Sequence, residues 1–322
     1  MPTIPGFITR YFTQEQPAPA KPPPISTGTA VFLLVLYTLI YVVPFYLSPT
    51  TRPSRTLSRD APSVIRARIA SVSLTCIACS IITFVILTSQ GQATTAEALH
   101  TLGYWPLGLI ETAKCFLLTA ILFAGPLYER LIIAEGWRDW LSLQPLYELF
   151  GELTTWRNIV AGPFTEEVLF RSASVPLMLA AQTSVTTTVF LSPLVFGLAH
   201  LHHFYEFRIT HPQVPVSFGL LRSLTQLGYT TLFGAYATFL FLRSGSLIAV
   251  FVVHAFCNCM GLPRVWGRVY PPVVVDERGQ SFRPSVIWTI VYYIFLVAGA
   301  VGWYRNLGSL TDSANALVSI NI

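Results

Sequence analysis

Three groups of polar side chains interrupt hydrophobic stretches of this chain, and together they could carry out a reaction. They are Glu166-Glu167 with Arg171, His200, and His254 with Asn258. An ionisable side chain at the centre of a bilayer costs about 2.5–3.5 kcal/mol on insertion scales, and such residues usually mark functional sites. The pattern therefore predicts a hydrolytic site between transmembrane helices.

The two adjacent glutamates differ in the partners that they can reach. A helix turns by about 100° between neighbouring residues, so Glu166 and Glu167 face different directions. Glu167 precedes Arg171 by four positions, which is the favourable order for a helical ion pair. Glu166 then has no partner on its own helix, and an unpaired carboxylate in an apolar site suits a general base that activates water. The alternative for this group is a salt bridge that only joins helices.

The remaining polar groups could complete such a site. His200 ends the segment Phe196–His200, and its imidazole could share proton transfer with Glu166 or orient the water. His254 and Asn258 are four residues apart and share one helix face, from which both can donate hydrogen bonds to an oxyanion. For His200 the alternative is a polar residue that only ends a helix. For His254 and Asn258 it is a pair of interhelical hydrogen bonds that only pack the bundle.

Other hydrolytic mechanisms have weaker support in the sequence. Glu166, His200 and His254 could bind zinc, which takes three protein ligands and a water in catalytic sites. The sequence has no His-Glu-x-x-His motif, so no cofactor is predicted, although zinc remains an alternative. It also has no Gly-x-Ser-x-Gly motif and no cysteine beside a polar triad, which argues against a serine or cysteine protease.

The composition is that of an integral membrane protein. Of the 322 residues, 53% are hydrophobic and 11% are charged, and the mean hydropathy is +0.58. A soluble domain has about 25% charged residues. The net charge of +5 is small and the basic residues are scattered, so nucleic acid is not an expected partner. The lipid bilayer is the expected partner. The five cysteines lie in or next to apolar segments, which argues against a disulfide framework.

The hydropathy pattern predicts an all-α, polytopic membrane protein with a bundle of about eight transmembrane helices. Gly28–Thr51 is uncharged and long enough to span a bilayer. Further spans are predicted at roughly 69–88, 104–126, 157–181, 185–203, 217–242, 244–262 and 285–304. The expected organisation is a disordered proline-rich tail (1–26), a membrane domain (27–305) and a C-terminal tail (306–322).

The loops predict which side of the membrane the site faces. If the spans alternate, the odd-numbered loops share one side and contain Arg52, Arg55, Arg59, Arg66, Arg130, Arg138, Arg208, Arg264, Arg268, Arg278 and Arg283. The other side has little beyond Arg10, Lys21, Arg243 and Arg305. The positive-inside rule then places the odd loops in the cytosol and both termini across the membrane. All three polar groups should meet at a similar depth, reachable from the cytosol.

An amphipathic segment is expected between the third and fourth spans. Residues 127–156 combine charged side chains with aromatic ones. Such a composition is typical of a segment that lies along the membrane interface.

The motifs resemble those of the type II CAAX prenyl endopeptidases. The resemblance rests on Glu-Glu-x-x-x-Arg at Glu166–Arg171, Phe-x-x-x-His at Phe196–His200 and His-x-x-x-Asn at His254–Asn258. The surrounding residues, from Arg157-Asn158 to Met260-Gly261, are similar as well, and the core of the resemblance spans about 155–267.

The resemblance implies a protease of the endoplasmic reticulum membrane that removes the last three residues from farnesylated or geranylgeranylated CAAX proteins, such as Ras-type GTPases. It implies that Glu166 activates water together with His200, and that His254 and Asn258 stabilise the oxyanion. Glu167 and Arg171 would support the site. A zinc-dependent version of the same protease remains an alternative, as does a transporter or scaffold in which the buried charges have another use.

Overall fold

The computed structural model describes residues 22–271 and 285–320. These residues form helices and connecting segments, with no β-strand among them. In chain order the helices are α1 (Thr27–Val42), α2 (Pro44–Leu47), α3 (Pro62–Ser89), α4 (Thr95–Thr101), α5 (Leu109–Leu122), α6 (Ala124–Leu127), η2 (Tyr128–Ile133), α7 (Trp137–Leu141), α8 (Gln144–Gly151), α9 (Leu153–Trp156), η3 (Arg157–Ala161), α10 (Gly162–Glu167), η4 (Val168–Ala173), α11 (Val175–Ala180), α12 (Val185–Ala199), α13 (His202–Thr210), α14 (Val216–Ser244), α15 (Leu247–Met260) and α16 (Ile287–Asn306). The disordered tail is predicted for residues 1–26, of which 1–21 lie outside the described residues and Ser26 caps the start of α1.

The prediction of an all-α membrane bundle is confirmed, because several of these helices can cross a bilayer. Within the described residues, four helical segments are long and apolar enough: Thr27–Leu47, Pro62–Ser89, Val185–Thr210 and Ile287–Asn306. A fifth is obtained if Leu109–Leu122 and Ala124–Ile133 form one span, although they are bent by 80°. The other predicted spans also lie on helices, but these are segmented, shorter or less apolar.

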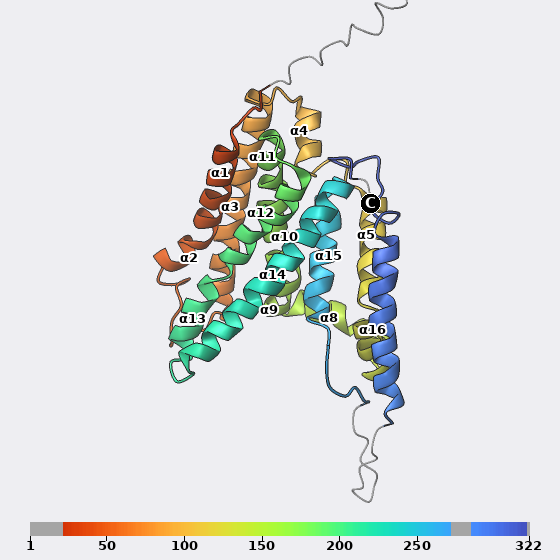
Figure 1. Cartoon of the computed structure of the whole chain (residues 1–322). Coiled ribbons are helices and arrows are strands. Elements are labelled where there is room, and N and C mark those ends of the chain that lie inside the picture. Colours follow the sequence, from red (N-terminus) through yellow and green to blue (C-terminus); the bar gives the residue numbers. More distant parts are fainter. Residues whose placement is uncertain (1–21, 272–284, 321–322) are drawn as a thin grey trace, which may run out of the picture.

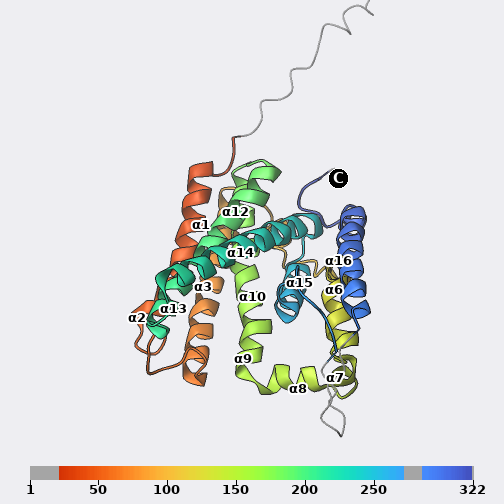
Figure 2. The same cartoon turned by 60° about the horizontal axis from the view of Figure 1, so that its bottom comes forward.

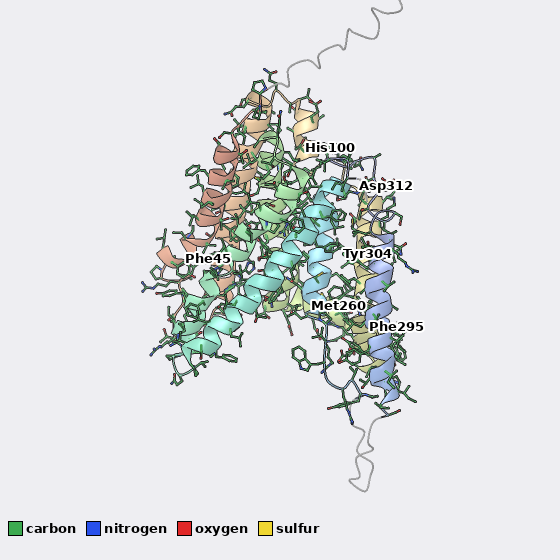
Figure 3. The ribbon with its side chains drawn as sticks, in the orientation of Figure 1. Phe45, His100, Met260, Phe295, Tyr304 and Asp312 are labelled. Atoms are coloured by element: carbon green, nitrogen blue, oxygen red, sulfur yellow. The ribbon has the colours of Figure 1, made fainter. Side chains whose placement is uncertain are left out.

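The bundle has two distinct ends. Figure 1 shows that α1 begins, and the C-terminal segment finishes, at the upper end. His100 and Asp312 lie toward this end, whereas Met260 and Phe295 lie in the lower half (Figure 3). The α2–α3 and α13–α14 connections lie at the lower end with α8 (Figures 1 and 2). The two described ends of the chain therefore lie at the same end of the bundle.

The segment predicted as a span at 157–181 is a helical run with two wide turns. Residues from Leu153 to Ala180 keep right-handed helical geometry, but η3 and η4 are π-helical turns on either side of α10. Figure 2 shows α9 and α10 in line, with α8 turned sideways toward α7. Single π-turns inside helices occur often at functional sites, because they change which side chains face a neighbouring helix.

Candidate active site

Helices α10, α12 and α15 bring the predicted residues to one cavity. The cavity has a volume of about 180 Å³, and Glu166, His200 and Asn258 all line it. His254 lies one helical turn before Asn258 on α15 and reaches the same group of residues. The three polar groups thus form one cluster, although Glu166 and Asn258 are 92 residues apart in the chain.

Glu167 is the buried centre of this cluster. Its side chain is fully buried, and its Oε1 accepts hydrogen bonds from Nη1 of Arg171 at 3.0 Å and from Nδ1 of His254 at 2.6 Å. The Arg171 guanidinium also lies over the ring of Phe196, 4.5 Å from its centroid. The predicted Glu167–Arg171 ion pair is present, and it fixes the orientation of the His254 ring. One atom of each partner, Oε2 of Glu167 and Nη2 of Arg171, is buried without a hydrogen-bond partner.

Glu166 occupies a different environment from its neighbour. Its side chain is 24% exposed and lines the cavity. Its Oε2 lies 3.8 Å from Nε2 of His254, too far for a direct hydrogen bond. The carboxylate is therefore open to the cavity, with a histidine close enough to share a bound water molecule.

Hydrogen bonding fixes the proton position on His200. This residue caps the C-terminal end of α12, and its Nδ1 lies 2.8 Å from the carbonyl oxygen of Phe196. A carbonyl only accepts hydrogen bonds, so Nδ1 must carry the proton. In the neutral imidazole Nε2 then has a lone pair that can accept a proton at the cavity.

Asn258 lies at the exposed end of the cluster. Its Nδ2 donates a hydrogen bond to the backbone carbonyl of Asn158 at 3.0 Å, which links α15 to η3. The amide nitrogen carries two hydrogens, so one of them remains for another acceptor. His254 and Asn258 thus lie on one helix, as their spacing predicts. One amide hydrogen of Asn258, however, is already hydrogen-bonded to the carbonyl of Asn158 in η3.

Residues that the sequence analysis did not select also form the cavity. Tyr41 lines it, and its hydroxyl is 3.0 Å from Oγ1 of Thr165, next to Glu166 in sequence. His202 and His203 line it as well, as do the arginines Arg59, Arg68 and Arg157. The cluster of arginines after the first span was visible in the sequence, but there it indicated only the orientation of the chain.

The zinc alternative does not fit the geometry of the described residues. Among them, no three His, Cys, Asp or Glu side chains stand close enough together to hold a metal ion. We therefore assign no step of a reaction to a metal.

Comparison with known proteins gives consistent matches. The family model described as "Type II CAAX prenyl endopeptidase Rce1-like" matches residues 149–260. The Schizosaccharomyces pombe protein named "Probable CAAX prenyl protease 2" is 37% identical, over 87% of this chain and 92% of its own length. The "CAAX prenyl protease 2" of Arabidopsis thaliana is 34% identical over 76% of this chain and 83% of its own length, and that of Homo sapiens is 32% identical over 78% and 76%.

No solved structure matches the chain, so the assignment rests on the sequence relatives. The family model covers the segment from α8 to the end of α15, which contains Glu166, His200, His254 and Asn258. The relatives extend the similarity over most of the chain. The chain therefore belongs to the Rce1-like family of type II CAAX prenyl endopeptidases.

Proposed function

We propose that this enzyme removes the C-terminal tripeptide from farnesylated or geranylgeranylated CAAX proteins, with Glu166 as the base that activates water. The observation that carries the proposal is the contrast between two adjacent carboxylates. Glu167 is fully buried and held by Arg171 and His254, whereas Glu166 is open to the cavity. The names of the curated relatives supply the substrate class.

The reaction requires one water molecule between Glu166 and His200. Glu166 accepts a proton from the water, and the resulting hydroxide attacks the carbonyl carbon of the prenylated cysteine. Nε2 of His200 orients the water by accepting a hydrogen bond from it. Its lone pair is free because the ring proton is on Nδ1, which donates to the carbonyl oxygen of Phe196. The proton then passes to the nitrogen of the leaving tripeptide as the C–N bond breaks. General acid–base catalysis of this kind contributes about 10²–10⁴-fold.

The negative oxygen of the tetrahedral intermediate would lie beside His254 and Asn258. Nδ1–H of His254 donates its hydrogen bond to Glu167. His254 can therefore donate a second hydrogen bond, from Nε2 to the oxyanion, only when both ring nitrogens carry a proton. Asn258 supplies its second amide hydrogen. Donors held in place before the reaction stabilise the oxyanion without the cost of reorganising water.

A membrane bundle suits a prenylated substrate. Each buried CH₂ group of a lipid anchor favours the bilayer by about 0.8 kcal/mol, so the prenyl chain stays in the apolar phase while the peptide enters the cavity. The arginine distribution supports a cytosolic opening, which is where Ras-type GTPases would present their C-termini. Residence in the endoplasmic reticulum membrane is part of this proposal.

The test is cleavage of a farnesylated CAAX peptide by the purified protein in detergent. We expect wild type to release the tripeptide and Glu166→Gln to be slower by at least about 100-fold with an unchanged melting temperature. Glu148→Gln is the matched control, because Glu148 is an exposed carboxylate on α8 whose contact is with Gln144. Both reactions are repeated with a zinc chelator.

Each outcome separates the alternatives. Full activity of Glu166→Gln would remove that residue from the role of base. Loss of wild-type activity in chelator, with recovery on added zinc, would favour the zinc-dependent version. A folded wild type that cleaves no prenylated peptide would favour a transporter or a scaffold.

A further inference from the structure

The cavity of Glu166 is lined by three cations that the proposed reaction does not use. Arg59, Arg68 and Arg157 line it, and Glu166 is the only acidic side chain among its described lining residues. Two acids that do not line the cavity pair with these arginines: Glu206 with Arg59 and Arg68, and Asp60 with Arg157 and, at 4.0 Å, with Arg59. The arginines therefore line the cavity, whereas the carboxylates that pair with them do not.

The three arginines are not equally available to a ligand. Arg68 donates from Nε and Nη2 to the carbonyl oxygen of Thr51, at 3.1 and 2.7 Å, and from Nη2 also to Glu206 at 3.0 Å. Its role is to hold the loop before α3. Arg157 uses Nε and Nη1, whereas its Nη2 has no hydrogen-bond partner among the described residues. Arg157 is also in contact with Arg59, because its Nη1 donates to the Arg59 carbonyl oxygen at 3.3 Å.

The charges at this end of the cavity do not cancel. Three arginines meet two carboxylates, Glu206 and Asp60, and Glu206 is shared by Arg59, Arg68 and His203. Asp60 is about half exposed, so its attraction for Arg157 is weakened by solvent. An anionic ligand placed between Arg59 and Arg157 would neutralise the excess.

The separation of Arg157 from Glu166 matches the length of the leaving peptide. Arg157 precedes Glu166 by nine positions on the helical run that joins η3 to α10, which corresponds to at most about 13 Å along the helix axis, because the π-turn η3 rises less per residue than an α-helix. A tripeptide in extended conformation spans about 10 Å from its first nitrogen to its end. The guanidinium can cover the remaining distance.

We propose that Arg157, with Arg59 beside it, binds the C-terminal carboxylate of the substrate. The inference rests on the proposed function, because a CAAX substrate ends in a free carboxylate three residues beyond the bond that is cut. Arginine binds carboxylates through paired, charge-assisted hydrogen bonds. Fixing the chain end at this distance from Glu166 places the correct peptide bond over the base and selects against internal sites, which have no carboxylate.

The experiment compares two farnesylated peptides that differ only at the C-terminus, one a free acid and the other an amide. We expect wild type in neutral detergent to cleave the acid with a kcat/KM about 10- to 100-fold higher than that for the amide, as loss of a charged hydrogen-bonded pair predicts. Arg157→Gln should lower kcat/KM for the acid to the level of the amide, mainly by raising KM. It should leave the amide unchanged, and Arg157→Lys should restore part of the preference.

Two further variants complete the design. Arg59→Gln should also reduce the preference for the acid, which provides a second test if Arg157→Gln fails to fold. Arg66→Gln is the matched control, because Arg66 is an exposed arginine of α3 that does not line the cavity. It removes one positive charge from the same end of the bundle and should change neither peptide.

Several results would overturn the inference. Equal cleavage of acid and amide by wild type would reject a carboxylate site and leave the proposed function intact. An equal loss on both peptides in Arg157→Gln would indicate a structural role for Arg157. Failure of wild type on both peptides would instead reject the proposed function, and the inference with it.

Discussion

Glu166 and Glu167 are neighbours in the chain, yet their surroundings give them different chemistry. Glu167 has no exposed surface and shares one oxygen between Arg171 and His254. A carboxylate in that position holds other groups in place and is not accessible to water. Glu166 has the cavity in front of it and His254 at 3.8 Å. In the proposed mechanism the two acids therefore have separate roles: Glu167 positions His254, and Glu166 activates water.

Removing one partner of the buried Glu167–Arg171 ion pair should destabilise the fold more than replacing both partners. We expect Arg171→Met to destabilise the protein by about 3–5 kcal/mol, because it leaves the Glu167 carboxylate buried without its cation. The double variant Glu167→Gln with Arg171→Met should recover most of that loss, because no uncompensated charge remains. Cleavage should stay low in both, because Arg171→Met leaves Glu167 without its ion-pair partner and the double variant also removes the charged acceptor of His254. Melting temperatures in detergent, measured beside activity, test this; a double variant less stable than Arg171→Met would contradict it.

Asn258 should affect the rate more than the fold. Its side chain is exposed, and its structural contact is the hydrogen bond to the Asn158 carbonyl. We expect Asn258→Ala to lower kcat by about 10²–10³-fold with little change in KM, which is the effect of removing one oxyanion donor. The adjacent exposed residue provides the control Cys259→Ser, which should have normal kinetics. A change confined to KM would show that Asn258 binds the substrate and does not stabilise the oxyanion.

At the scale of the element, a glycine sets how closely α12 approaches α14. A Cβ on Gly197 would collide with Oγ1 of Thr231 and lie 2.9 Å from Cδ1 of Leu227. We expect Gly197→Ala to destabilise the protein by about 1–3 kcal/mol through overpacking and to slow cleavage, because His200 lies three residues further along. Gly228 of α14 has open space around it. Gly228→Ala should be neutral or stabilising, through better helix propensity. Equal melting temperatures for the two variants would exclude the close contact.

The helices and the grouping of the candidate site residues could be predicted from sequence because their signals are local. A carboxylate four residues before an arginine, or a histidine four residues before an asparagine, determines which side chains share a helix face. The arginines of the cavity could not be found in this way. Arg157 contacts Asp60 and Arg59, which lie 97 and 98 residues earlier in the chain, and only the packing of η3 beside the loop before α3 brings them together.

The division of the fourth predicted span into α-helical and π-helical segments could not be predicted from the sequence either. Hydropathy indicates that residues 157–181 are buried, and it contains no information on whether a turn holds four or five residues. The π-turns η3 and η4 both pack against α3 and α15. The carbonyl of Asn158 in η3 accepts a hydrogen bond from Asn258, and Arg171 in η4 pairs with Glu167.

At the scale of the whole molecule, the segment between α6 and α9 fits the predicted interfacial position. Helices α7 and α8 expose large apolar side chains, including Trp140, Leu141, Tyr147 and Phe150. Figure 2 shows α8 turned sideways from the run that contains α10. A helix of this kind lies along the membrane surface with its apolar face among the lipids. The α10 run, with Glu166, would then enter the bilayer from that surface.

The orientation of the molecule can be tested with acceptor sites for N-glycosylation, which is added to asparagine in surface segments of secreted chains. The α2–α3 connection, which contains several of the arginines, lies at the same end of the bundle as the α13–α14 connection, and the described C-terminal segment lies at the other end (Figure 1). If the positive-inside rule governs this chain, an Asn-x-Thr site on a C-terminal extension is glycosylated in the endoplasmic reticulum, and one inserted at 212–214 is not. Active fusions analysed by gel shift, with and without glycosidase, provide the measurement. The reverse pattern would place the cavity of Glu166 on the lumenal side, where cytosolic prenylated proteins could not reach it.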